Sequence, residues 1–317
     1  MSTREERPLA GARIDLAQLL ALRFETLAES RLPGRVTSMQ GGARLSRYRG
    51  RGLDFAEVRA YAPGDDVRTI DWKVTARKGR VHTKVFREER ERVCMIFVDQ
   101  TQSMFFGSRL RLKSVAAAEV AARLAWRALA EQDRVGGVVV GNDSLAVHPP
   151  YRVAKTLARY LGDVSRYNQR LARGAQHPES AHIAAAIDRL CRLARRDQRI
   201  YLISDFQTLS SSAPDSGPGW TTDHWRRGLR TLARHNEVIA IRVCDALEAE
   251  LPPADLYRIT DGAARWQFDA GDPRLRQRYR DNANNHADAF ARACSDAGVR
   301  MAVLTTDASI GATLASL

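Results

Sequence analysis

The stretch that decides the fold is Val93-Cys94-Met95-Ile96-Phe97-Val98-Asp99, followed by Gln100-Thr101-Gln102-Ser103. Its unbroken apolar run, rich in β-branched and aromatic residues, is typical of a strand buried on both faces of a parallel sheet. Open α/β sheets bind their ligands at the carboxyl ends of such strands. There, Asp99, Thr101 and Ser103 offer oxygen atoms on one short loop, a donor set that suits Mg²⁺ and also fits Mn²⁺ or Ca²⁺. The stretch therefore predicts a central strand that ends in a candidate cation site.

From residue 93 onward, apolar strand-like runs alternate with amphipathic helical patterns, which is typical of a sheet with helices on both faces. Strands are expected at 93–99, 135–141, 199–205, 237–243 and 300–306, and helices at about 109–131, 152–167, 181–196, 222–235 and 273–297. The segment Gly141-Asn142-Asp143-Ser144 has the composition of a hairpin turn, so 144–148 is expected to be an antiparallel edge strand. The fold class is therefore α/β, with a doubly wound, mostly parallel sheet.

Two further segments precede this α/β domain of residues 93–317. In the first, residues 1–35, an apolar stripe predicts a helix over 13–30, ended by Pro33-Gly34. The second, residues 36–92, contains many glycines and is expected to be a small β-rich module. Within it, 69–74 and 81–86 are predicted to pair as a hairpin, and Trp72 is expected in the core.

The net charge of +13 raises the possibility of nucleic-acid binding. The arginines are scattered along the whole chain, however, and only residues 31–53 form an arginine-rich run without an acid. Direct nucleic-acid binding through this run is therefore a minor hypothesis. The four cysteines form no Cys-x-x-Cys pair, and no apolar run approaches the roughly 20 residues of a membrane helix. We expect a cytoplasmic protein with no membrane span.

A second acidic residue, Asp205, ends the predicted strand 199–205 in the same way that Asp99 ends its own. If the two strands are neighbours, both carboxylates face one crevice and repel each other unless a cation or a proton lies between them. A third oxygen is expected from the loop before helix 181–196, where His177, Glu179 and Ser180 are available and Ser180 is favoured. The alternative is that Ser180, Asp99 and Ser103 simply cap helices and turns.

The pattern Asp99-x-Thr101-x-Ser103, the later Ser204-Asp205 and the α/β alternation resemble a von Willebrand factor A domain. The resemblance implies a metal-ion-dependent adhesion site at these residues, with Thr101 in place of the usual first serine. It also implies that Ser180 stands where a threonine is usual. A module of this kind binds proteins through a shared metal and catalyses no reaction.

Upstream, Arg59-x-Tyr61-x-Pro63-Gly64-Asp65-Asp66-x-Arg68-x-Ile70-Asp71-Trp72 resembles the signature of domain of unknown function family 58. Downstream, Asp245-Ala246-Leu247-Glu248 resembles the Asp-Pro-Leu-Glu motif of that family, with Ala246 in place of proline. This resemblance implies a partnership with a MoxR-type AAA+ ATPase, and possibly with other von Willebrand factor A proteins. Many such relatives carry N-terminal membrane helices, whereas this sequence contains none.

Three questions about function and about individual residues remain open from the sequence alone. A strand that ends in Asp, followed by a later strand of the same kind, also begins a magnesium-dependent phosphatase, although Thr101 stands where such enzymes need a second aspartate. The acids and arginines of the upstream signature form either a docking surface or an internal network of turns and salt bridges that links the β-rich module to the sheet, and we favour the network. Glu119 lies on an apolar helix stripe and is expected to be a partly buried carboxylate, for which an arginine partner is favoured over a catalytic role.

Overall fold

The computed structural model describes residues 8–30, 53–62, 65–88, 92–172, 180–207, 220–260 and 265–315. The chain divides into two compact units, one formed by Met1–Arg31 with Arg92–Leu317 and the other by Leu32–Glu91. Most of the arginine-rich run 31–53 lies outside the described residues. No helix in the described ranges is long and apolar enough to cross a membrane.

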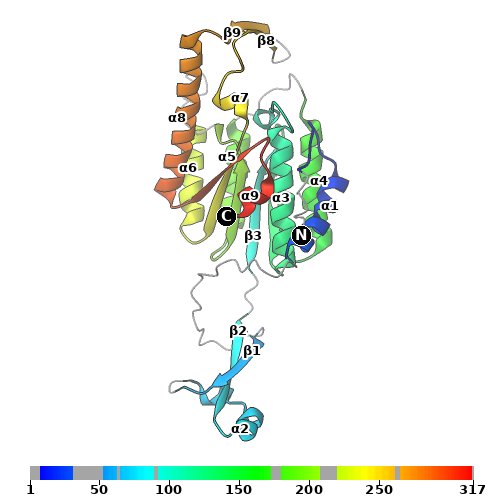
Figure 1. Ribbon diagram of the computed structural model, residues 1–317, viewed down its shortest axis with the longest axis vertical. Helices are drawn as coiled ribbons and strands as arrows, with labels where there is room; N and C mark the ends of the chain where they lie inside the picture. The colour runs from blue at the N-terminus through cyan, green and yellow to red at the C-terminus, as the bar shows by residue number, and fades with distance from the viewer. Residues whose placement is uncertain are drawn as a thin grey trace. The chain divides into compact units, whose positions relative to one another are not determined.

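A six-stranded sheet forms the centre of the larger unit, with strand order β10-β7-β6-β3-β4-β5 (Figure 1). Its strands are β3 (Val93–Asp99), β4 (Arg134–Val140), β5 (Leu145–Tyr151), β6 (Arg199–Ser204), β7 (Glu237–Cys244) and β10 (Arg300–Thr305). All neighbours pair in parallel except β5, which is antiparallel to β4. The mostly parallel sheet and its antiparallel edge strand were predicted from the alternation and from the turn composition.

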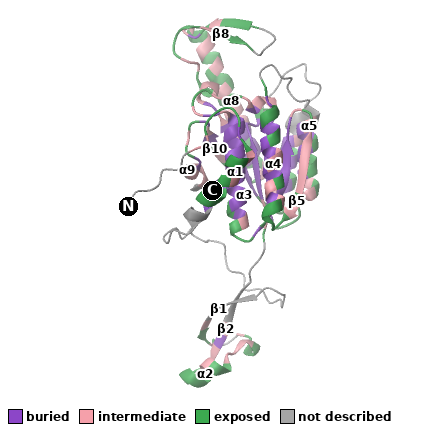
Figure 2. Cartoon of the chain, turned by 90° about the vertical axis from the view of Figure 1, so that its right-hand side faces the viewer, coloured by how far each residue is buried: buried purple, intermediate pink, exposed green. Residues whose placement is uncertain are grey.

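Helices cover both faces of this sheet, because alternate residues of each strand point to opposite sides. On β3, Ile96 and Val98 pack with α1 (Leu16–Ser30), α3 (Lys113–Ala130) and α4 (Ala154–Arg170). Met95 and Phe97 pack instead with α5 (Ser180–Leu193), α6 (Trp220–Ala233) and α8 (Pro273–Ala297). Buried residues accordingly fill the sheet and the inner faces of its helices (Figure 2). The chain ends with α9 (Ile310–Ala315) beside β10.

The smaller unit contains the antiparallel pair β1 (Leu53–Ala60) and β2 (His82–Glu88), together with α2 (Trp72–Lys78). The predicted strand 69–74 is wrong: Val67–Thr69 is a short 3-10 turn and Trp72 begins a helix. The Asp71 side chain caps this helix at its start, and Gly79 ends it with a left-handed φ of 67°. These two caps outweigh the β-like local composition. Of the predicted hairpin, which lies within the described residues, only one antiparallel bridge, between Ile70 and Thr83, is present, and the strand 82–88 pairs with β1.

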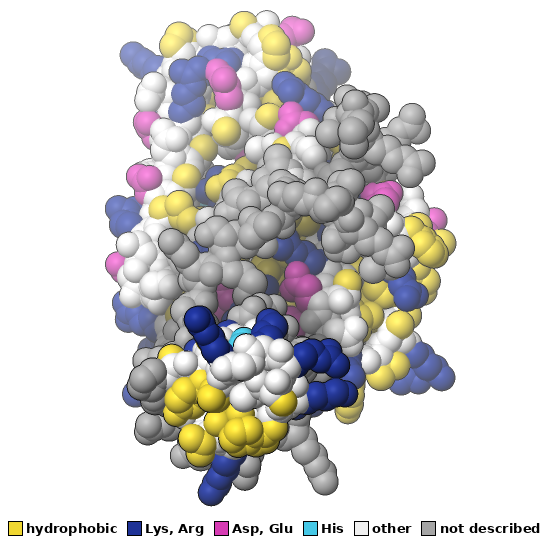
Figure 3. All heavy atoms as spheres, turned by 60° about the horizontal axis from the view of Figure 1, so that its bottom comes forward, with side chains coloured by type: hydrophobic (Ala, Val, Ile, Leu, Met, Phe, Trp, Pro, Cys, Tyr) yellow, Lys and Arg dark blue, Asp and Glu magenta, His cyan; other side chains and the backbone are white. Residues whose placement is uncertain are grey.

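Part of the charged signature forms turns and salt bridges within this unit, whereas the predicted link from the unit to the sheet remains a prediction. Asp65 pairs with Arg59 at 2.7 Å, and Asp71 both caps α2 and lies 3.5 Å from Lys84. The prediction that Trp72 is a core residue is wrong, since 69% of it is exposed. Figure 3 shows hydrophobic side chains of this unit bordered by Lys and Arg side chains.

Several elements of the larger unit were not predicted from the sequence, among them α9 and the segment between β7 and α8. The short helix α7 (Ala246–Ala249) follows β7, and the antiparallel pair β8 (Leu256–Thr260) and β9 (Arg265–Asp269) stands between α7 and α8. Figure 1 shows α7 and the β8–β9 pair at the end of the unit opposite the start of β3. That end is where the parallel strands have their carboxyl termini.

Candidate functional site

Asp99 and Asp205 meet at the carboxyl edge of the sheet because β3 and β6 are neighbouring parallel strands. Val98 lies opposite Ile203 in the register, so the next residues, Asp99 and Ser204, are placed side by side. Asp99 is 1% exposed and Asp205 is 4% exposed. The two acidic strand ends therefore lie close together in a buried position, as predicted for the case in which the two strands are neighbours.

The Asp99 carboxylate is held by hydroxyl and amide donors. Its Oδ1 accepts hydrogen bonds from the Thr101 backbone N at 2.9 Å and from the Thr101 hydroxyl at 2.7 Å. Its Oδ2 accepts from the Ser204 hydroxyl at 2.6 Å. The hydroxyls of Thr101 and Ser103 lie 3.3 Å apart. Three of the oxygen donors predicted from the loop thus lie together in one hydrogen-bonded group.

Asp205 is fixed by a sharp reversal of the chain directly after β6. Phe206 has a left-handed φ of 55°, a strained backbone conformation for a bulky residue. This turn lets the Gln207 backbone N donate to Asp205 Oδ1 at 3.2 Å and the Phe206 N donate to the Ser204 hydroxyl at 3.1 Å. The buried Phe206 ring packs on Trp225 and Phe290, which fixes the turn in place.

A buried lysine, which was not identified from the sequence, completes the site. Lys113 Nζ donates to Asp205 Oδ2 at 2.9 Å and to Glu248 Oε1 at 2.6 Å, and its side chain is fully buried. The available signal was weak: a lysine at the first position of a helix is electrostatically unfavourable and requires a compensating acid. Its acids lie 92 and 135 residues away in the sequence.

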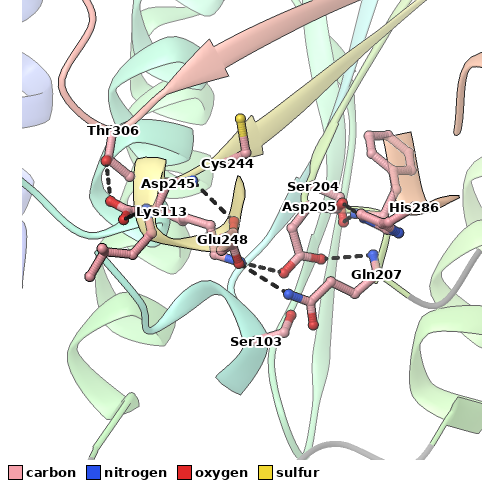
Figure 4. A network of polar contacts seen from close by, with 12 residues as sticks. Ser103, Lys113, Ser204, Asp205, Gln207, Cys244, Asp245, Glu248, His286 and Thr306 are labelled. Atoms are coloured by element: carbon pink, nitrogen blue, oxygen red, sulfur yellow. Dashed lines mark hydrogen bonds and ion pairs between the residues drawn. The ribbon is translucent and has the colours of Figure 1, made fainter. Parts of the chain in front are cut away.

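The downstream family motif supplies one of these acids. Asp245 caps α7 in a capping box, in which the Glu248 side chain accepts from the Asp245 backbone N at 3.0 Å. Asp245 also accepts from the Ser108 N at 2.9 Å and from the Thr306 hydroxyl. Figure 4 shows this network running from Thr306 through Glu248 to Asp205 and Gln207. The motif therefore connects β7 and β10 to the acidic strand ends.

The two aspartates differ in their affinity for a proton. Burial, together with the nearby charge of Asp205, raises the pKa of Asp99 to about 6. Burial acts in the same direction on Asp205, but the charge and hydrogen bond of Lys113 outweigh it, and the net effect lowers the pKa of Asp205. Asp205 therefore remains ionised, and Asp99 is the acid that takes up a proton when no other cation is present.

The donor set fits a hard divalent cation in its chemistry. Within the described residues there is no group of three or more His, Cys, Asp or Glu side chains that could hold a metal. A metal here would therefore depend on hydroxyl oxygens, and those of Thr101 and Ser103 lie beside two carboxylates. Ser180 is the first residue of α5, but its side chain lies outside the described residues, as do His177 and Glu179.

The contribution of Asp99 to stability is expected to fall as the pH rises from about 4 to about 6 in the absence of divalent metal. The folded chain holds this proton up to about pH 6, whereas the unfolded chain loses it near pH 3.8. The folded state therefore binds more protons in this window, and by linkage the loss is roughly 3 kcal/mol.

Asp99→Asn removes this titration and keeps a side chain of the same shape. Urea unfolding of both proteins in a chelator should show the variant gaining roughly 3 kcal/mol relative to the original chain between pH 4 and pH 7. A stability difference that stays constant over this range would contradict the assignment of the proton to Asp99.

Comparison with known proteins places the chain in a family. The model of the family described as "Protein of unknown function DUF58" matches residues 57–289, which include the second half of β1, all of β2, Asp99 and Asp205, and most of α8. The chain is also 31% identical over 271 residues to "Uncharacterized protein Mb1516" of Mycobacterium bovis and to "Uncharacterized protein Rv1480" of Mycobacterium tuberculosis. Each alignment covers 84% of this chain and 78% of the relative. The chain therefore belongs to the DUF58 family.

Proposed function

We propose that this protein is a non-catalytic interaction module of the von Willebrand factor A type, which binds a partner protein through a metal-ion-dependent adhesion site. The observation that carries the proposal is the meeting of Asp99 and Asp205 beside the hydroxyls of Thr101 and Ser103. These residues lie at the carboxyl edge of a sheet with helices on both faces, where α/β proteins of this kind bind ligands.

In this proposal the hydroxyls of Thr101 and Ser103 hold Mg²⁺, or Mn²⁺ or Ca²⁺ in its place. Asp99 and Asp205 contribute their charge directly or through water, and Ser180 is the proposed donor from the third loop. When bound, the metal supplies a Lewis-acidic position that a carboxylate of the partner completes. Asp99 orients the Thr101 hydroxyl, and Ser204 in turn orients Asp99.

The partner that the family resemblance suggests is a MoxR-type AAA+ ATPase, and other von Willebrand factor A proteins are further candidates. The alternative, a magnesium-dependent phosphatase, would use Asp99 as its first aspartate and needs a second one two positions later. Both oxygens of Asp99 accept hydrogen bonds, and Thr101 occupies the position where a phosphatase of the alternative type needs an aspartate. We therefore propose an adaptor in preference to an enzyme.

Asp99→Ala is expected to abolish magnesium-dependent capture of a purified MoxR-type ATPase from the same organism. The substitution removes one metal-side carboxylate and the acceptor that orients Thr101, so the metal loses both charge and a positioned ligand. The measurement is affinity capture of the ATPase with Mg²⁺ and with a chelator, together with circular dichroism to establish that the variant is folded.

Asp143→Ala is the matched control, because Asp143 follows β4 at the same edge of the sheet but its side chain is 76% exposed. This variant should capture the ATPase as the original chain does. Undiminished capture by a folded Asp99→Ala protein would refute the adhesion-site proposal. Phosphatase activity that needs Mg²⁺ and Asp99 would favour the hydrolase instead.

A further inference from the structure

Lys113 occupies a position that is costly for a positive charge. Its side chain is fully buried, and it lies at the first position of α3, where the helix dipole repels cations. Such a charge is retained only where acids offset the cost of burial. Lys113 has two such acids, Asp205 at 2.9 Å and Glu248 at 2.6 Å.

These two acids are themselves held in place, so the lysine has a preformed binding position. Glu248 Oε2 accepts from the Asp245 backbone N, while Glu248 Oε1 accepts from Lys113 and from the Gln207 side chain at 3.1 Å. Asp205 Oδ1 accepts from the Gln207 backbone N. Figure 4 shows Glu248 and Asp205 converging from α7 and from the end of β6. The contact with Lys113 is thus built from three separate elements of the fold.

Asp205 contacts both the buried lysine and the residues of the candidate metal site. Its Oδ2 accepts a hydrogen bond from Lys113 and its Oδ1 accepts one from the Gln207 backbone N, while the carboxylate also interacts with Ser103 and with the charge of Asp99. The ammonium therefore neutralises, in advance, part of the negative charge that a divalent cation beside Asp99 would require. At a separation of roughly 4 Å inside a protein, one unit of charge changes the affinity for a cation by about tenfold or more.

We propose that Lys113 is a specificity-determining residue of this site: a resident ammonium that shares Asp205 with the divalent cation and keeps cation binding weak until a partner carboxylate is added. This inference rests on the proposed adhesion site. It assigns to Lys113 a role that a purely structural ion pair would not have. Neutralising the lysine should then strengthen the binding of metal in the absence of any partner.

The test is the affinity of the purified full chain for Mn²⁺ alone, measured by electron paramagnetic resonance and calorimetry. Lys113→Met and Lys113→Gln are expected to bind Mn²⁺ at least about tenfold more tightly than the original chain. Lys113→Arg retains the positive charge and should not show this gain in affinity. Lys155→Met removes an exposed lysine from α4 and should change nothing. Adding Asp99→Asn to Lys113→Met should remove the gain.

The outcomes separate this inference from the proposed function. Equal Mn²⁺ affinity in the original chain and in both neutral variants would overturn the role of Lys113 and leave the adhesion site intact. No Mn²⁺ binding by any of the proteins would overturn both. Binding by the neutral variants alone would support the lysine as the resident cation. Lys113→Gln retains a polar group toward Glu248, so it supplies the answer if Lys113→Met does not fold.

Discussion

Glu119→Ala is expected to lower the free energy of unfolding by about 3–5 kcal/mol, because it removes the carboxylate that pairs with the buried guanidinium of Arg111. Glu119 Oε2 accepts from Arg111 at 2.6 Å and Glu119 Oε1 accepts from Arg123 at 3.0 Å. The side chains of Glu119 and Arg111 are fully buried. Glu119 Oε2 also accepts from the Leu9 backbone N at 2.8 Å, so the same change removes a hydrogen bond that holds the N-terminal segment against α3. Urea unfolding measures the loss of stability.

The matched control is Glu131→Ala at the other end of α3. Glu131 pairs with Arg127 at 3.2 Å, but both side chains are about half exposed, so the change should cost less than about 1 kcal/mol. If the two variants were equally stable, Glu119 would not be the acid that balances Arg111. Limited proteolysis should also cut residues 8–15 faster in Glu119→Ala than in the control.

Much of this architecture follows from local sequence patterns. The apolar runs of β3 and β6 predict strands buried on both faces, and the turn at 141–144 predicts an antiparallel edge. Neighbouring parallel strands then place their terminal residues at one edge, so the approach of Asp99 to Asp205 follows from the pattern once the strands are adjacent. The stripe of α3 also predicts that Glu119 is at least partly buried, and a buried carboxylate is expected to have an arginine partner.

The parts that escaped prediction depend on contacts between distant residues or on caps. Lys113 resembles any of the other basic residues until the fold brings Asp205 and Glu248 to it. The segment 69–74 has a β-like composition, but the Asp71 cap and the left-handed Gly79 select a helix. Trp72 was predicted to be a core residue, but in the smaller unit it is mostly exposed. In each case tertiary or capping interactions outweigh local propensity.

The second large prediction concerns the close approach of the backbones of β3 and β4. These two strands lead to the edge of the sheet where Asp99 lies. Gly137 lies opposite Ile96 in the parallel register, and a Cβ added there would lie 1.9 Å from the Ile96 carbonyl oxygen. That oxygen belongs to the backbone of the central strand, so it cannot move aside as a flexible side chain would. Gly137→Ala is therefore expected to destabilise the chain by about 3 kcal/mol or more, and to weaken Mn²⁺ binding by displacing the end of β3.

Gly162→Ala is the informative comparison, because it makes the same chemical change where there is room. A Cβ at Gly162 would meet only Leu16 Cδ2 at 3.9 Å, and the residue lies inside α4, where alanine is preferred to glycine by up to about 1 kcal/mol. Thermal unfolding should therefore move in opposite directions for the two variants. If Gly137→Ala unfolded at the same temperature as the original chain, β3 and β4 would not be held as closely as their register requires. The placement of Asp99 would then depend on its own hydrogen bonds to Thr101 and Ser204 rather than on the sheet.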